Sequence, residues 1–180
     1  DAETERSSFL EQLEDSKTSS DELNSMIEEA DNTIQQLNED LLMQQNLVVE
    51  WIQRAASNDF SYANMSNVDL NNADMSNADL TGADLSNSIL TNAFLWNAIM
   101  SGTNLNSANM NSTNLSNTNL KNTDLSFAVI SSSNLTGADL TGADLSSANL
   151  RGADLYAVQM KGANLRGLDL SGVIIADSNL

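Results

Sequence analysis

From residue 60 to residue 180, every fifth residue is Phe, Met, Leu or Ile, and no insertion or deletion interrupts the spacing. We call this large apolar residue the centre of its five-residue unit. A period of five matches neither the 3.6-residue period of an α-helix nor the two-residue period of a β-strand, so ordinary helices and strands are poor interpretations. The spacing instead predicts a repeat architecture in which one small unit recurs and buries its centre.

Two further positions of the unit are restricted. Two residues before the centre stands a small or β-branched residue, as at Ala78 and Thr103, which we expect to point inward with the centre. Two residues after the centre stand all eight glycines and eight of the asparagines. Glycine and asparagine adopt positive φ at the lowest cost, so this position predicts one corner in every unit.

The unit reads Ala-Asp-Leu-Thr-Gly at residues 78–82 and again at residues 138–142, and this motif resembles the pentapeptide-repeat proteins. The resemblance covers residues 56–180. It implies an all-β solenoid, a right-handed quadrilateral β-helix with four units in each twenty-residue coil and about six coils. At a strand spacing of roughly 4.8 Å, the rod would be on the order of 30 Å long.

Residues 1–55 differ in composition and in period. They carry fourteen acidic and three basic side chains, net −11, whereas residues 56–180 carry eleven and four, net −7. Ser19 with Glu22 forms a capping-box pattern, which predicts a long helix from Ser20 to Ala55, with Asp15–Ser20 separating it from a shorter helix before it. We therefore expect an acidic helical segment over 1–55 and the repeat domain over 56–180.

Apolar residues recur in heptads along this helix, which is typical of a coiled coil. The residues expected to mediate self-association there are Leu23, Ile27, Ile34, Leu37, Leu41, Val48 and Trp51. Isoleucine at one core position and leucine at the other favour a dimer, although Ala30, Leu41 and Gln44 leave a trimer open. In the alternative, the last turns fold over the first coil with Trp51 and Ile52 as a lid.

Most outward positions of the repeat are Asp, Asn, Ser or Thr, which we expect to bond to neighbouring backbone at the corners. The exceptions that gather in one stretch are Ile89, Phe94, Trp96 and Ile99, and we predict a surface contact patch there. Scattered exposed apolar residues are normal on protein surfaces, so the alternative is that these four have no partner.

Composition excludes several classes of function. The net charge is −18 with no histidine and no cysteine, so we expect no direct nucleic-acid binding, no catalytic site, no metal and no cofactor. No apolar run reaches the roughly 18 residues that a membrane span needs. The chain begins with Asp1 rather than Met, which fits removal of a signal peptide and equally fits removal of a tag or an engineered start; we expect a secreted, periplasmic or cell-surface location slightly ahead of a cytoplasmic one.

The repeat register runs to Leu180, a core-type residue with no polar cap after it. An uncovered solenoid end is a template for further pairing. The sequence thus predicts a non-catalytic, self-assembling structural protein, a dimer, fibre or sheath subunit that associates through its helix and this terminal coil. One alternative, taken from the family resemblance, is a DNA mimic directed at gyrase or topoisomerase, although the aspartates are spread over all four faces. The other is a monomeric scaffold for protein-protein interaction.

Overall fold

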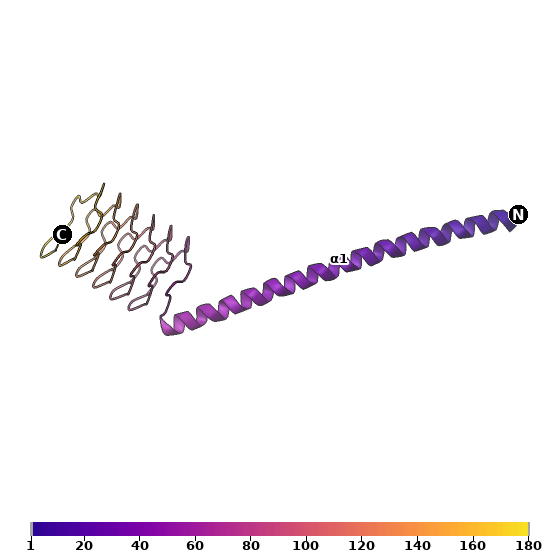
Figure 1. Ribbon diagram of the computed structural model, residues 1–180, viewed down its shortest axis with the longest axis horizontal. Helices are drawn as coiled ribbons and strands as arrows, with labels where there is room; N and C mark the ends of the chain where they lie inside the picture. Colours follow the sequence, from indigo (N-terminus) through magenta and orange to yellow (C-terminus); the bar gives the residue numbers. More distant parts are fainter. Residues whose placement is uncertain (1, 180) are drawn as a thin grey trace. The chain divides into compact units, whose positions relative to one another are not determined.

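The computed structural model describes residues 2–179, and within the helix it leaves out the side chains of residues 2–4, 15, 18, 20, 21, 44, 46–49 and 52. The chain contains one long helix, α1 (Ala2–Ser57), and then a stack of short coils (Figure 1). It divides into two compact units, Asp1–Ile52 and Gln53–Leu180. The predicted N-terminal helix is confirmed.

α1 is continuous, so the predicted break over Asp15–Ser20 and the predicted helix start at Ser19 are wrong. The stretch contains neither glycine nor proline. Its serine, threonine and aspartate residues each cost only about 0.5–0.7 kcal/mol relative to alanine in a helix. The better helix formers on both sides outweigh that cost, and Ser19 lies inside the helix rather than at its cap.

The helix ends through a hydrogen-bonded cap. Asn58 follows the last helical residue with φ of 56°, and the Asp59 N–H donates to the Arg54 carbonyl at 3.2 Å. This six-residue bond around a left-handed residue is the Schellman arrangement, which satisfies a carbonyl that the helix leaves free. Asn58 therefore ends α1, and the first corner of the solenoid follows at Tyr62 with φ of 55°.

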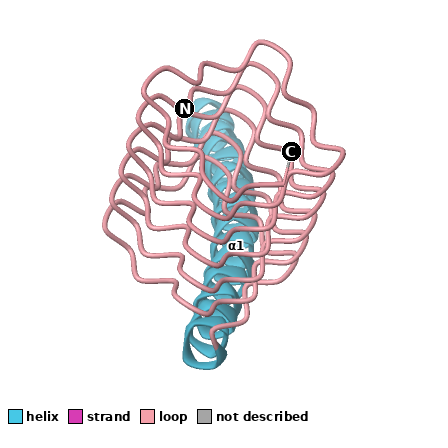
Figure 2. Cartoon of the chain, turned by 90° about the vertical axis from the view of Figure 1, so that its left-hand side faces the viewer, coloured by secondary structure: helices cyan, strands magenta, loops and turns pink. Residues whose placement is uncertain are grey.

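Each coil of the solenoid contains twenty residues. Parallel β-bridges join residues twenty positions apart, from Asp59 with Asp79 to Gln159 with Asn179, and between them the described chain forms single bridges rather than longer strands (Figure 2). A residue with positive φ follows every bridge by three positions, as at Asn77 with 61°. The five-residue period, the corners and the solenoid class are confirmed, whereas the hand of the solenoid and its coil number stay predictions.

Backbone hydrogen bonds tie each coil to both neighbours. The Leu80 N–H donates to the Ile99 carbonyl at 2.7 Å, and the Gly82 N–H at the corner donates to the Ser101 carbonyl at 3.0 Å. In the other direction, the N–H of Asp79 donates to the carbonyl of Asn58 at 2.9 Å. The units repeat this pattern as far as the last described coil, so backbone hydrogen bonds form a continuous ladder between coils.

The interior is filled by the centres and by the small residues two positions before them. From Leu80 to Leu155 every centre is fully buried. Some of the small residues are threonine or serine, and most of their hydroxyls donate to carbonyls of the preceding coil, as Thr103 Oγ1 does to Leu80 at 2.7 Å. The inward direction of these residues is confirmed, and the buried hydrogen bonds add polar ties between coils that the period alone does not reveal.

Where the residue before a centre is aspartate or asparagine, its side chain faces outward and stabilises the next corner. Asp79 Oδ1 accepts the Thr81 N–H at 2.9 Å, and the same bond recurs along the solenoid with aspartate or asparagine as acceptor. Amides also bridge coils, as Asn104 Nδ2 does to Asp84 Oδ1 at 3.0 Å. The structural role predicted for these polar residues is confirmed.

Candidate functional site

The heptad residues of α1 form an unpartnered apolar stripe. Their exposed fractions are 56% for Leu23, 57% for Ile27 and Ile34, 62% for Leu37 and 57% for Leu41. A continuous helix places these residues and Ala30 on one side, because with Ala30 included their spacings alternate between four and three. We call this stripe the α1 seam. Trp51 is half-buried, and the side chain of Val48 lies outside the described residues.

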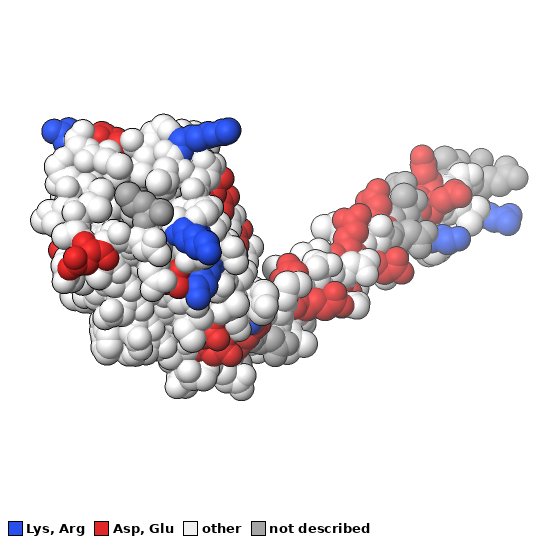
Figure 3. Space-filling model, turned by 60° about the vertical axis from the view of Figure 1, so that its left-hand side comes forward, with Lys and Arg blue, Asp and Glu red and all other residues white. Residues whose placement is uncertain are grey.

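The positions that flank the α1 seam are mostly uncharged. Asn24, Asn38 and Gln45 stand on one side of it, and Met26 and Thr33 stand on the other. Most of the acidic residues lie farther round the helix, where they form the red surface in Figure 3. A second helix could therefore approach the seam without a row of like charges against it.

The outer side of α1 also carries local hydrogen bonds. Gln35 Nε2 donates to Glu39 Oε1 at 3.2 Å, and Gln36 Nε2 donates to Asp40 Oδ1 at 3.1 Å. Such pairs four residues apart stabilise a helix by about 0.2–0.5 kcal/mol each. They stiffen α1 without occupying the seam.

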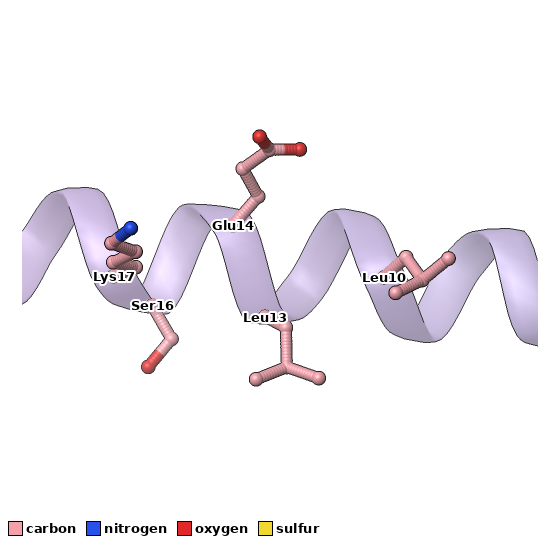
Figure 4. Close-up of a pocket in the computed structure, with 5 residues that line it drawn as sticks. All are labelled: Leu10, Leu13, Glu14, Ser16 and Lys17. Carbon is pink, nitrogen blue, oxygen red and sulfur yellow. The ribbon is translucent and has the colours of Figure 1, made fainter.

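A shallow hollow on α1 is lined by Leu10, Leu13, Glu14, Ser16 and Lys17 (Figure 4). All five belong to the same two turns, and Glu14 points away from Leu13 and Ser16. The hollow is therefore an open stretch of helix surface rather than a chamber that could hold a substrate.

The four predicted patch residues of the solenoid lie on three faces. We number the faces by their bridge residues in chain order: face 1 contains Asp59, Asp79, Ile99 and Asn119; face 2 contains Asn64, Asp84 and Asn104; face 3 contains Asp69, Ile89 and Asn109; face 4 contains Asp74, Phe94 and Asn114. Trp96 occupies the corner that joins face 4 to face 1. Phe94, Trp96 and Ile99 thus share one edge, while Ile89 stands round the next corner on face 3.

These residues are exposed to similar degrees, 43% for Ile89, 50% for Phe94, 44% for Trp96 and 45% for Ile99. Other large exposed side chains stand apart, including Phe127 at 61% and φ of 59°. The structure places all four predicted residues on the surface, but it divides them into an edge of three and a single isoleucine.

Tyr62 is an exposed aromatic residue that the sequence did not single out. It stands at a corner with φ of 55° and is 78% exposed. Its ring lies over Gly82, where a Cβ atom would come within 2.6 Å of the ring. The sequence could have revealed Tyr62, because the residues at the same corner in the later coils are all glycine or asparagine.

Several carboxylates of the solenoid have a pKa that is lowered by hydrogen bonds from their own corners. Hydrogen bonds from Ser76 lower the pKa of Asp74, and those from Ser146 lower the pKa of Asp144. Within residues 2–179 no group of three or more His, Cys, Asp or Glu side chains is placed to bind a metal ion. Across the same residues, no helix is both long enough and apolar enough to cross a bilayer.

The last described coil leaves its centres in contact with solvent. Leu165, Leu170 and Ile175 are 37%, 42% and 43% exposed, whereas the corresponding centres two coils earlier are fully buried. At the other end, Arg54 Nη1 donates to the Ser61 carbonyl at 3.0 Å and covers part of the first coil. Leu180, the terminal residue predicted to take part in association, lies outside the described residues.

Comparisons with known proteins agree with this geometry. The family model described as pentapeptide repeats matches eight copies over residues 59–92, 78–117, 88–126, 108–146 and 138–177. No curated protein sequence matches the chain.

Among solved structures, two trypsin-treated forms of QnrB1, a plasmid-mediated fluoroquinolone resistance protein, share the fold. They have TM-scores of 0.52 and 0.53 and identities of 19% and 20%; the matches cover 66% and 62% of this chain and 68% and 59% of theirs. A pentapeptide repeat protein from the Arabidopsis thaliana thylakoid lumen is 30% identical over 63% of this chain and 72% of that one, with a TM-score of 0.40.

The matched repeats span residues 59–177, well over half of the chain, and every one of them falls in the twenty-residue coils described above. The chain belongs to the pentapeptide-repeat family.

Proposed function

We propose that this chain is a non-catalytic structural protein that self-associates through the α1 seam. The observation that carries the proposal is the exposure of the seam: Leu23, Ile27, Ile34, Leu37 and Leu41 are all more than half exposed on one helix of 56 residues. Most of the stability of a long helix comes from packing of its apolar side, and α1 offers that side at heptad spacing.

The partner that fits the seam best is a second copy of α1 in parallel register. Isoleucine at Ile27 and Ile34 with leucine at Leu23 and Leu37 is the arrangement that favours two parallel strands. Parallel register also places the small Ala30 against its own copy, so the narrow part of each seam meets the other. Between residues 24 and 45 the flanking positions are uncharged except for Asp31 and Asp40, which leaves room for this approach but supplies no ion pairs between the two copies.

Single-cysteine variants test this arrangement directly, because the chain has no cysteine of its own. Ala30→Cys and Gln44→Cys place a thiol at two core positions of the heptad, about 21 Å apart along a helix. A parallel pair brings each thiol to its own copy within disulfide range, so both variants should form covalent dimers on mild oxidation.

The matched control is Asn32→Cys, which puts the thiol on the outer side of α1 and should give no covalent dimer on a non-reducing gel after the same oxidation. Light scattering of the unmodified chain gives the mass of the assembly. A monomeric mass over the accessible concentration range, with equal crosslinking at all three positions, would refute self-association through the seam. Crosslinking of only one core variant would indicate an antiparallel pair.

The exposed centres of the last described coil are the second surface of the proposal. The N–H groups of Leu165 and Leu170 point along the solenoid in the pattern that earlier coils use to bond the next rung, and within the described residues they have no acceptor. A further rung would bury these leucines and satisfy the donors, and a second copy can supply it. Light scattering of Leu170→Asn, which would make the end polar, tests whether this surface adds to the association.

A DNA mimic is less well supported. The fold that the chain shares with QnrB1 is compatible with such a role, but a mimic of DNA phosphates needs a continuous acidic surface. The solenoid has no charged residue between Asp84 and Lys121, which interrupts any acidic stripe for almost two coils. A gyrase supercoiling assay with the full chain would test this alternative.

A further inference from the structure

Three exposed apolar residues lie around the edge between face 4 and face 1. Phe94 forms β-bridges with Asp74 and Asn114, and Ile99 occupies the corresponding place on the next face. Trp96 lies at the corner between them. We call Phe94, Trp96 and Ile99 the apolar edge. Apart from Ile174 in the Phe94 column, and Tyr156 and Ala176 in the Trp96 column, the residues of their columns are Asp, Asn, Gln, Ser or Thr, so the three residues interrupt a mostly polar surface.

The coil before the apolar edge is acidic and has no compensating cation. Asp74 lies one coil before Phe94 on face 4 and forms a β-bridge with it, and Asp79 stands in the same relation to Ile99 on face 1. No lysine or arginine occurs between residues 55 and 120, and neither carboxylate has an ion-pair partner among the described residues. Farther along the solenoid the situation differs, because Lys121 pairs with Asp139 at 3.1 Å.

Both carboxylates accept a backbone hydrogen bond through Oδ1. Asp74 Oδ1 accepts the Ser76 N–H at 3.1 Å and Asp79 Oδ1 accepts the Thr81 N–H at 2.9 Å, so each holds its corner with one oxygen. The hydrogen bonds from Ser76 lower the pKa of Asp74, which keeps that group charged. Neighbouring rungs of a sheet lie about 4.8 Å apart, so a negative charge stands one rung from an exposed apolar side chain on each face.

We propose that the apolar edge binds another protein through a basic amphipathic helix. On a helix, residues three or four positions apart are about 5–6 Å apart. A lysine or arginine three or four positions from a leucine therefore matches the distance of one rung between Asp74 and Phe94. The apolar residues of the partner cover Phe94, Trp96 and Ile99, and its cations meet the two aspartates. A second copy of this chain is a poor occupant, because residues 1–55 carry net −11 and the whole chain net −18.

The probe is a synthetic helical peptide of about fourteen residues, roughly 21 Å long, with leucine on one side and lysine on the other. Two comparison peptides replace every lysine by glutamate or every leucine by serine. Binding to the full chain is measured by calorimetry. We expect saturable binding of the leucine-lysine peptide and affinities at least about tenfold lower for both comparison peptides, since large apolar anchors and charge contacts both contribute.

The variants use residues that neighbouring coils already carry in the same columns. Phe94→Asn copies Asn114 and Ile99→Asn copies Asn119, so the fold should tolerate them. Together they should weaken peptide binding about tenfold or more. The control is Phe127→Ser, which removes a more exposed aromatic residue elsewhere on the solenoid and should leave the affinity unchanged.

Charge is tested separately with Asp74→Asn combined with Asp79→Asn. This variant should weaken binding several-fold at low salt and have little further effect at about 1 M salt, where the screening length is about 3 Å. Emission of Trp96, isolated by Trp51→Phe, should shift to shorter wavelength as the peptide covers the ring.

Three results would overturn the inference. Equal binding of the serine-lysine peptide would mean that charge alone attracts the probe. Equal binding of the leucine-glutamate peptide would mean that the edge binds apolar surfaces without regard to charge. A fall in the mass of the unliganded protein on changing Phe94 and Ile99 would show that a second copy occupies the edge. None of these outcomes depends on the α1 seam, so the two proposals succeed or fail separately.

Discussion

Two neighbouring leucines on α1 allow the proposed seam to be tested with one matched pair of substitutions. Leu41 and Leu42 are almost equally exposed, at 57% and 59%, but Leu41 lies in the seam and Leu42 lies one position outside it. Leu41→Asn and Leu42→Asn make the same chemical change in the same turn, so their intrinsic cost to the helix is the same. Any difference between them reports on the contact that the seam makes.

The size of the difference follows from the burial that pairing would add. Full burial of a leucine side chain is worth about 1.5–3 kcal/mol, and a residue that is 57% exposed has roughly half of that still to gain. Loss of about 1–1.5 kcal/mol from each of two chains gives about 2–3 kcal/mol for the pair, which is about 30- to 150-fold in the dissociation constant. Leu42→Asn should change it by less than about threefold, because that side chain stays in water in both states.

Sedimentation equilibrium over a range of concentrations measures both dissociation constants, and circular dichroism at each concentration reports whether α1 stays helical. Equal weakening by the two substitutions would refute the seam, because it would show that general apolarity of α1 rather than heptad position drives association. No effect of either substitution would do the same.

The remaining predictions concern the solenoid. Leu115→Asp should abolish the folded solenoid, because it puts a charge at a fully buried centre, whereas Asn114→Asp next to it should shift the urea midpoint very little. Thr113→Val should lower the free energy of unfolding by about 1 kcal/mol in urea titrations, since its hydroxyl donates to the Leu90 carbonyl at 2.8 Å and valine keeps the volume. Thermal melts should show falling stability as the pH drops below about 4: the pKa of Asp144 is lowered by folding, so its contribution is present above the unfolded pKa and is lost as the pH falls through the folded one. Unchanged melting between pH 5 and about pH 2.5 would contradict that assignment.

The solenoid was predictable because each unit repeats the same three requirements. A centre such as Leu115 must be buried, a small residue must fit beside it, and a corner residue such as Asn77 must adopt positive φ. Twenty-five repetitions leave almost no other arrangement that satisfies all three. The buried bonds of Thr103 and Thr113 were not predictable, because alanine and threonine occupy the same position and only the stacking of coils brings a carbonyl within reach.

The helix and the candidate patch were less accessible from sequence for different physical reasons. Serine and aspartate over residues 15–20 resemble a cap, yet their small individual costs do not outweigh the continuous helix around them. The patch residues are close together in the sequence, but a corner turns the chain after every unit. Ile89 is therefore on a different face from Ile99, and sequence proximity alone could not show it.

The distribution of charge determines which partner each surface can accept. Most acidic residues of α1 lie away from the seam, so repulsion between copies acts mainly outside the contact and leaves apolar packing to decide the pairing. The apolar edge is instead bordered by Asp74 and Asp79, which disfavour another copy of this acidic chain and favour a cationic one. If α1 pairs as proposed, each particle carries two such edges, and a partner with two basic helices within reach gains roughly 10²- to 10⁴-fold in avidity without any new contact. Self-association and partner binding would then strengthen each other even though they use separate residues.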